Sequence, residues 1–370
     1  MDISIVYNPQ EQDLRIPLSP GAISTIVKNG HNVYILKGAG TASDFSDEDY
    51  LNKGAKIVYS PEEAYQRGKL ILTVTPPPFE VISLMNKGSI LMCFLHLAVA
   101  SEKYLAELLN RKITAIGFEV ISDSSGELPI LSATSEIAGS LSIHVATQYL
   151  QSNFGGKGIL LGGAPGIQPA NILVIGAGSV GRAAAETASA LGANVLIVDR
   201  DIKKLRMVER HYGKGVHTGF SSVHGLTEWV KESDVVIGAI YIKGAKAPIV
   251  VSEEMVASMK KKSLIIDLSI DQGGCIATSR PTTLKSPVYE YKGVIHYCVP
   301  NITSLVAHSS SLSISHVLFP YILELTNSGD DFLKYIPDIA SGAYTHKGKI
   351  TMKVLAELFK KKYFPIESLF

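Results

Sequence analysis

Residues 172–199 read ILVIGAGSVGRAAAETASALGANVLIVD: an apolar run, a glycine-rich turn, an alanine-rich segment, a second apolar run and an acid. This order predicts a strand, a turn, a helix and a second strand. Within Gly176-x-Gly178-x-x-Gly181, the first glycine permits the tight turn, the second lets a pyrophosphate approach the backbone, and the third lets the helix pack against the sheet. The helix N-terminus then offers unpaired N–H groups and the positive end of its dipole to phosphates. The stretch therefore predicts a Rossmann-type dinucleotide site.

The acid that closes this stretch bears on the choice of dinucleotide. Asp199 stands near the position, about 20 residues after the turn, where a carboxylate accepts hydrogen bonds from the adenosine ribose of NAD. It would repel the 2′-phosphate of NADP, although Arg200 beside it could pair with that phosphate. NAD is therefore the expected cofactor, and use of NADP stays open.

Composition limits the rest of the chain. Its 370 residues are 46% hydrophobic and 19% charged, which is enough for two globular domains and gives no sign of disorder. The 35 basic and 34 acidic residues form no long basic run, so we expect a small-molecule partner and neither nucleic acid nor a membrane.

The cysteines and the amino terminus bear on location. Cys93, Cys275 and Cys298 are widely spaced and odd in number, which favours buried thiols over disulfides or a metal site. The amino terminus has early charges and no cleavable apolar stretch. We therefore expect a cytoplasmic protein without a bound metal.

Short apolar runs alternate with helical patterns along most of the chain, which predicts an α/β protein with two Rossmann-like, doubly wound parallel-sheet lobes and a cofactor cleft between them. A long helix is expected from SATSEIAGS onward, with Ser132 or Thr134 near its cap. The C-terminal part shows no strand runs and reads as helical. We expect it to pack on the first lobe, which gives a catalytic domain of residues 1–130 plus 305–370 and an NAD-binding domain of residues 131–304.

Two residues of the first lobe are candidates for chemistry. Arg15, in DLRIPLSP, is either a solvated surface arginine or a bidentate clamp for a substrate carboxylate. His96 closes the apolar run ILMCFLHLAVA and is either a hydrogen-bonded core residue or an acid–base group at a strand end. Residue type alone does not choose between these alternatives.

Three further polar residues follow strands of the second lobe. Asp267 and Asp271 lie in IIDLSIDQGG, where one could cap the glycine turn and the other could orient water or ammonium. Asn301, in YCVPNITS, could bind the nicotinamide carboxamide or the substrate. Because open α/β sheets bind ligands at the carboxyl ends of their strands, all three are expected near the site.

Several of these segments together resemble the alanine dehydrogenase and nicotinamide nucleotide transhydrogenase family. The match runs nearly end to end and includes LRIPLSP, FLHLA, SEIAGS, GGKGILLGGAPG, VIGAGSVG, GAKAP, IDQGGC with SRPTT, and YCVPN. These motifs agree better with alanine dehydrogenases than with the transhydrogenase subunit. The resemblance implies reversible NAD-dependent oxidation of alanine to pyruvate and ammonia by a homo-oligomer, usually a hexamer.

The resemblance also implies roles for individual residues. It makes His96 the acid–base group, Asp271 the carboxylate that assists water or ammonia, and Arg15 the substrate clamp, with Asn301 also near the substrate. The residues that it places around the cofactor are Ser135, Gly176, Gly178, Ser179, Val180, Gly181, Asp199, Lys204, Ser221, Ile240, Tyr241, Asp271, Arg280 and Asn301.

One departure concerns the substrate. Alanine dehydrogenases carry a lysine in the strand end that corresponds to ILTVTPPP, where it binds the substrate and polarises the ketone oxygen; the best match here is Thr75. A threonine can donate a hydrogen bond but supplies no positive charge. Loss of one preorganised donor costs about 10²–10³ in rate, or about 3–4 kcal/mol. The segment YNPQEQD also departs from the family pattern.

Three hypotheses follow from these observations. The first is an NAD-dependent alanine dehydrogenase. The second is a related oxidoreductase that acts on another amino acid, or on an imine formed from a 2-oxo acid and an amine, as in opine-type synthases. The third is a catalytically inactive NAD-binding homologue. The presence of Arg15, His96 and Asp271 together argues against the third.

Overall fold

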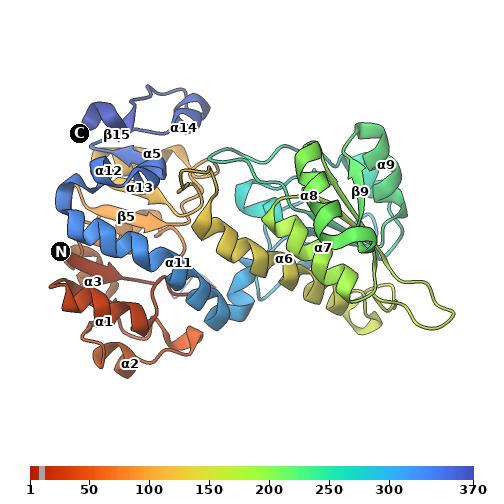
Figure 1. The fold of residues 1–370 in the computed structure, drawn as a ribbon, viewed down its shortest axis with the longest axis horizontal. Coiled ribbons are helices and arrows are strands. Elements are labelled where there is room, and N and C mark those ends of the chain that lie inside the picture. The colour runs from red at the N-terminus through yellow and green to blue at the C-terminus, as the bar shows by residue number, and fades with distance from the viewer. Residues whose placement is uncertain (8–12) are drawn as a thin grey trace. The chain divides into compact units, whose positions relative to one another are not determined.

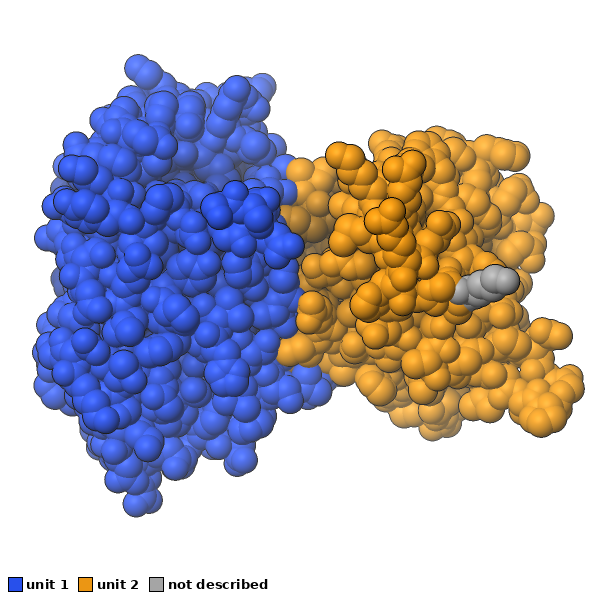
Figure 2. Space-filling view, in the orientation of Figure 1, with its two compact units in different colours: residues 1–134, 243–245, 304–370 blue, residues 135–242, 246–303 orange. Residues whose placement is uncertain are grey.

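The computed structural model describes residues 1–7 and 13–370, and Figures 1 and 2 show its two compact units. Most of YNPQEQD lies outside the described residues. Unit 1 comprises Met1–Thr134, Lys243–Ala245 and Ser304–Phe370, and unit 2 comprises Ser135–Ile242 and Lys246–Thr303. The C-terminal part of the chain therefore belongs to the same unit as the N-terminal part.

Unit 1 is built on a sheet whose described strands follow the order β15-β14-β6-β5-β4-β1-β2-β3. The parallel strands are β1 (Asp2–Ile5), β2 (Asn32–Leu36), β3 (Lys56–Val58), β4 (Leu70–Leu72), β5 (Ile90–Cys93) and β6 (Thr114–Gly117). The helices are α1 (Pro20–Lys28), α2 (Asp47–Leu51), α3 (Pro61–Arg67), α4 (Phe79–Ile82), α5 (Glu102–Asn110), α11 (Ala307–Ser328), α12 (Phe332–Tyr335), α13 (Pro337–Ser341) and α14 (Lys353–Leu358). The strand order reverses between β1 and β4, which is where doubly wound sheets bind ligands.

The C-terminal part contains strands that the sequence pattern did not predict. β14 (Ala343–His346) pairs antiparallel with β6, and β15 (Lys349–Ile350) pairs antiparallel with β14. The expectation of a purely helical tail was therefore wrong, because these strands are too short to show a period-2 pattern and contain polar residues. Their effect is to extend the first sheet at its β6 edge.

Unit 2 is a sheet in the order β12-β13-β11-β10-β7-β8-β9 among the described residues. Its strands are β7 (Asn171–Ile175), β8 (Asn194–Asp199), β9 (His217–Phe220), β10 (Val235–Gly238), β11 (Leu264–Asp267), β12 (Val288–Tyr291) and β13 (Val294–Tyr297). Its helices are α7 (Ser179–Ala190), α8 (Ile202–Tyr212), α9 (Val223–Glu232) and α10 (Glu253–Ser258). Among the described strands of this sheet, only β12 is antiparallel to its neighbour. Two doubly wound, mostly parallel sheets confirm the predicted fold class.

Alternation along β7 explains why both faces of this sheet are covered. Ile172 and Val174 pack in one apolar cluster with residues of α7 and α8, whereas Leu173 and Ile175 pack in another with residues of α9 and α10. Successive strand residues point to opposite faces, so a near-continuous apolar run is required when helices lie on both.

The long helix α6 spans Pro129–Tyr149 and contains the change from unit 1 to unit 2. It begins earlier than expected, because Pro129 suits the first turn of a helix. Ser132 and Thr134 therefore lie inside the helix instead of capping it, and the Thr134 hydroxyl donates to the carbonyl of Leu131 at 3.0 Å. No helix in the described part of the chain is both long and apolar enough to cross a membrane.

Candidate active site

The glycine turn of unit 2 connects β7 to α7 as the sequence predicts. Gly176 has a φ of +111°, and a Cβ there would overlap the carbonyl oxygen of Ala239. A Cβ on Gly181 would overlap the carbonyl of Gly176, whereas a Cβ on Gly178 would meet nothing within 4 Å. The outer two glycines thus permit close packing, and the middle one faces open space. This cradle fits the pyrophosphate of a dinucleotide at the helix N-terminus.

The contrast between these glycines gives a first prediction. Gly181→Ala is expected to lower stability by about 1–3 kcal/mol through overpacking. Gly178→Ala is expected to keep the Tm of the parent and to weaken NAD binding about tenfold or more, since a hydrogen bond to a charged group contributes about 1.5–3 kcal/mol. Thermal unfolding and calorimetric titration with NAD measure the two effects. A Gly178→Ala protein that binds NAD like the parent would contradict a pyrophosphate at this turn.

Asp199 closes β8 and holds the turn. Its Oδ2 accepts a hydrogen bond from the Ala177 N–H at 2.8 Å, and its Oδ1 accepts one from the Asp201 N–H at 2.9 Å. The Lys204 ammonium lies 3.9 Å from Oδ2, and the Ser221 N–H donates to the Asp199 carbonyl at 3.0 Å. Because an ionised carboxylate has about four lone-pair sites, these contacts leave capacity for ribose hydroxyls.

Two further predicted residues of unit 2, Asp271 and Asn301, follow the strands β11 and β13. Asn301 has a left-handed backbone, with a φ of 56°, and its N–H donates to Asp271 Oδ1 at 3.3 Å. Asp267, by contrast, is 1% exposed and accepts from the N–H groups of Ser269, Cys275 and Ile276. Burial raises the pKa of Asp267. Asp267 is thus the structural cap, and Asp271 is the half-buried carboxylate that could act on a ligand.

The other predicted cofactor residues of unit 2 are spread over several elements. Ser179 and Val180 form the first turn of α7, and the Ile240 N–H, next to Tyr241, donates to the Ser269 hydroxyl at 2.9 Å. Ser135 lies one helical turn before Gly139, where a Cβ would overlap the carbonyl of Val180, so Ser135 shares the face of α6 that meets this turn. The Arg280 guanidinium stacks on Tyr289 at 4.3 Å and is exposed.

The predicted substrate residues of unit 1 follow neighbouring strands. His96 comes after β5 and Thr75 after β4, while Arg15 lies in the loop after β1. The Phe94 ring links two of them, because the Arg15 guanidinium lies 5.9 Å from its centroid and the His96 ring stacks at 6.2 Å. Arg15 and His96 therefore both lie near the Phe94 ring, at the carboxyl edge of this sheet.

Arg15 is a buried residue, which excludes the solvated alternative. It is 4% exposed and forms an ion pair with Asp13, which is 8% exposed. The Nε donates to Asp13 Oδ1 at 2.8 Å, and Nη2 pairs with Oδ2. Sequence reasoning missed Asp13, although its position two residues before Arg15 is a signal for such a pair. The carboxylate makes the guanidinium less positive toward any ligand.

Thr75 and its neighbour Thr73 are buried, with 7% and 2% of their surfaces exposed. Three hydrogen bonds hold the strand end that carries them: the Thr73 N–H donates to the Met92 carbonyl at 3.3 Å, the Phe94 N–H to the Val74 carbonyl at 3.0 Å, and the Tyr104 hydroxyl to the Pro77 carbonyl at 3.0 Å. Both threonines are neutral. This strand end therefore offers hydroxyl groups where the resemblance predicts the ammonium group of a lysine.

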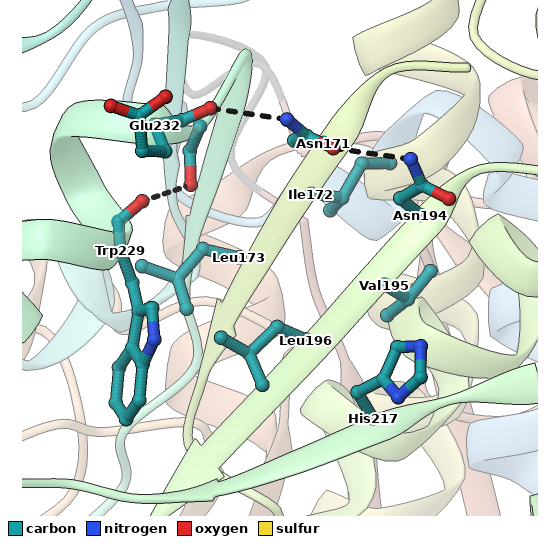
Figure 3. Close-up of a pocket in the computed structure, with 10 residues that line it drawn as sticks. Asn171, Ile172, Leu173, Asn194, Val195, Leu196, His217, Trp229 and Glu232 are labelled. Atoms are coloured by element: carbon teal, nitrogen blue, oxygen red, sulfur yellow. Dashed lines mark hydrogen bonds between the residues drawn. The ribbon is translucent and has the colours of Figure 1, made fainter. Parts of the chain in front are cut away.

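The cavity of Figure 3 lies on unit 2 but at the wrong edge for the cofactor. Its volume is about 190 Å³, and it is lined by Asn171, Asn194 and His217, which begin β7, β8 and β9, together with Trp229 of α9. The glycine turn and Asp199 lie at the opposite ends of the same strands. Ligand pockets usually measure about 300–1,000 Å³, so this slot cannot hold a dinucleotide.

Comparison with known proteins covers nearly the whole chain. The family model described as "Alanine dehydrogenase/PNT, N-terminal domain" matches residues 6–138, and "Alanine dehydrogenase/PNT, C-terminal domain" matches residues 142–353. An alanine dehydrogenase of Methanococcus maripaludis is 39% identical over 369 residues, which are 99% of each chain. An alanine dehydrogenase of Halomonas elongata is 36% identical over the full length of both. A solved structure of an L-alanine dehydrogenase is 34% identical, covers 97% of this chain and 99% of its own, and has a TM-score of 0.89.

Proposed function

The chain belongs to the alanine dehydrogenase/PNT family, as its motifs predicted, and we propose that it is an NAD-dependent enzyme that oxidises L-alanine to pyruvate and ammonia and also catalyses the reverse reaction. The observation that supports the proposal is the placement of Arg15 and His96 near the Phe94 ring, in a chain whose other unit has the glycine turn expected for a dinucleotide. A hexameric assembly, expected by resemblance, and a cytoplasmic location, expected from the sequence, belong to the same proposal.

The reaction balances as L-alanine, NAD⁺ and water giving pyruvate, ammonium, NADH and one proton. NAD, when bound, supplies the hydride acceptor. Arg15 binds the substrate carboxylate, and the Thr75 hydroxyl donates a hydrogen bond to the ketone oxygen of pyruvate. His96 removes a proton from the water that attacks the imino carbon and returns a proton to the departing amine. Asp271 orients that water or ammonia, with Asn301 beside it.

Asp199 is proposed to select NAD over NADP. Asp199→Ala is expected to raise the KM for NAD about tenfold to a hundredfold, since each hydrogen bond to a charged group contributes about 1.5–3 kcal/mol. The KM for NADP should fall, because the repulsion of a 2′-phosphate disappears. Steady-state kinetics with both cofactors measure the change, with Arg200→Ala as the comparison. If Asp199→Ala leaves the ratio of the KM values for NAD and NADP unchanged, Asp199 does not contact the ribose.

A second candidate function is favoured by the two buried threonines. Thr73 and Thr75 supply no charge, and Arg15 is already paired with Asp13. The substrate-binding residues of unit 1 therefore carry less positive charge than the resemblance to alanine dehydrogenases predicts. This favours a related dehydrogenase for another amino acid, or a reductase of an imine formed from a 2-oxo acid and an amine. A panel of 2-oxo acids crossed with ammonia and amines, followed by NADH consumption, separates the candidates. NAD binding without turnover of any pair indicates an inactive homologue.

A further inference from the structure

We propose that Glu119 is a positioning residue for His96: its buried carboxylate binds the backbone of His96 and thereby fixes the direction of the imidazole. This inference rests on the proposed function, in which His96 transfers the proton. Glu119 is 0% exposed and lies just after β6, the neighbour of β5. Beyond the paired strands, the Phe118 N–H donates to the Cys93 carbonyl at 2.8 Å, which keeps Glu119 beside the segment that carries His96.

The carboxylate accepts hydrogen bonds from two consecutive peptide groups. The His96 N–H donates to Oε1 at 2.8 Å, and the Leu95 N–H donates to Oε2 at 3.1 Å. The Tyr344 hydroxyl also donates to Oε1, at 2.8 Å. Glu119 is fully buried, and these three groups hold its carboxylate against the segment that carries His96. Its action on the reaction therefore passes through His96.

His96 needs such a restraint because its backbone is in the left-handed region, with a φ of 45°. Residues with a Cβ adopt this conformation at a cost in free energy, and they keep it only where surrounding contacts determine it. Charge-assisted hydrogen bonds from two successive N–H groups to one carboxylate define the orientation of both peptide planes. These planes lie on either side of Leu95, and the Val99 N–H donates to the His96 carbonyl at 3.0 Å on the far side of His96. Both peptide planes that flank His96 are therefore held, which sets the direction of its Cα–Cβ bond.

The imidazole itself has few other restraints. Among the described residues, His96 Nδ1 is buried and has no hydrogen-bond partner, so no carboxylate or carbonyl orients the ring from that side. The ring stacks on Phe94 with an interplanar angle of 13°. Backbone geometry and this stack therefore decide where the imidazole points, in place of the hydrogen-bonded partner that usually orients an acid–base histidine.

Tyr344 and Gly117 complete the arrangement. Tyr344 is 1% exposed and belongs to β14, so the C-terminal strand brings its hydroxyl to the end of β6. A Cβ on Gly117 would come within 2.5 Å of the Tyr344 ring and 2.8 Å of Glu119 Oε1, and glycine at this position leaves room for both. The antiparallel strand β14 thus contributes a hydrogen-bond donor to Glu119, beside the segment that carries His96.

The test uses Glu119→Gln, Tyr344→Phe and, as the matched control, the exposed Glu80→Gln. Glutamine offers one acceptor oxygen, and its NH₂ group opposes the second peptide N–H. We expect Glu119→Gln to lower kcat for alanine about tenfold to a hundredfold, the effect of a small misplacement of a reacting group, while KM for NAD stays unchanged. Tyr344→Phe should lower kcat less, because both peptide hydrogen bonds persist. Glu80→Gln should match the parent.

A second readout does not depend on activity. Amide hydrogen exchange at Leu95 and His96, measured in the full chain without substrate, should be faster in Glu119→Gln than in the parent and in Tyr344→Phe. Unchanged exchange in Glu119→Gln overturns the proposal, and so does a parental kcat in that variant. An equal loss of Tm, NAD binding and kcat in both variants indicates a purely structural role and overturns it too. If the parent oxidises no substrate, the proposed function fails, while the exchange experiment still tests whether Glu119 restrains the backbone of His96.

Discussion

His96→Asn is expected to lower kcat for alanine oxidation by about 10²–10⁴-fold, the usual contribution of a positioned acid–base group. Asparagine is the suitable replacement because it tolerates the left-handed backbone that His96 adopts, with a φ of 45°, and it cannot exchange a proton near neutral pH. The change therefore removes the imidazole while leaving the hydrogen bonds of its N–H group in place. Single-turnover kinetics with saturating NAD measure the effect.

The affinity for NAD is the internal control of this experiment, because the glycine turn belongs to the other unit and should not respond. His224→Asn, on the exposed face of α9, serves as the matched control and should behave like the parent. A His96→Asn enzyme that retains most of its turnover would remove His96 from the mechanism.

Arg15→Met is expected to destabilise the protein by about 3–5 kcal/mol, since it leaves the buried Asp13 carboxylate without its partner. Methionine is of similar length and fills much of the same buried space without a charge. The double variant Asp13→Asn/Arg15→Met should recover most of this loss because it removes both charges. Denaturant unfolding followed by circular dichroism is the suitable measurement, because the single tryptophan, Trp229, lies in unit 2 and reports little on unit 1.

Substrate affinity distinguishes the two roles of Arg15. KM for alanine should rise about tenfold to a hundredfold or more in both the single and the double variant, because each hydrogen bond to the carboxylate contributes about 1.5–3 kcal/mol. Recovery of stability without recovery of KM identifies Arg15 as a substrate ligand. Equal stability of the single and double variants would show that the ion pair with Asp13 is not a buried, dry pair.

The features best predicted from the sequence are those that depend on residues close together in the chain. The turn at Gly176–Gly181 depends on backbone conformation and on helix packing within one strand–helix unit, and both leave glycine at defined spacings. Periodicity likewise indicated the alternation of strands and helices in both sheets. Capping is local too: in α8, the Asp201 side chain accepts from the Lys203 N–H at the first turn, and Gly213 follows the last residue.

What the sequence could not supply depends on residues far apart in the chain. β14 pairs with β6 across more than half of the sequence, and its four residues are too few for a period-2 pattern. The carboxylates of Asp13 and Glu119 look like ordinary surface residues by type. Their burial, and the donors that they accept, exist only after the strands of unit 1 have assembled.

Thr75 illustrates the remaining limit at the candidate site. Its position after β4 was predicted from the strand pattern, but the charge of its surroundings depends on the Arg15–Asp13 pair, which no periodicity reveals. The cofactor half of the proposal therefore follows from local motifs, whereas substrate choice depends on tertiary contacts. The alternative substrates are therefore argued from Thr73, Thr75 and Arg15 of unit 1.

Assay of the purified full chain with L-alanine and NAD, and in reverse with pyruvate, ammonia and NADH, tests the central claim most directly. The absorbance of NADH should rise in the forward direction and fall in the reverse direction, and His96→Asn should slow both changes by about 10²-fold or more. No change in either direction from a protein that still binds NAD by calorimetry would contradict alanine dehydrogenase activity.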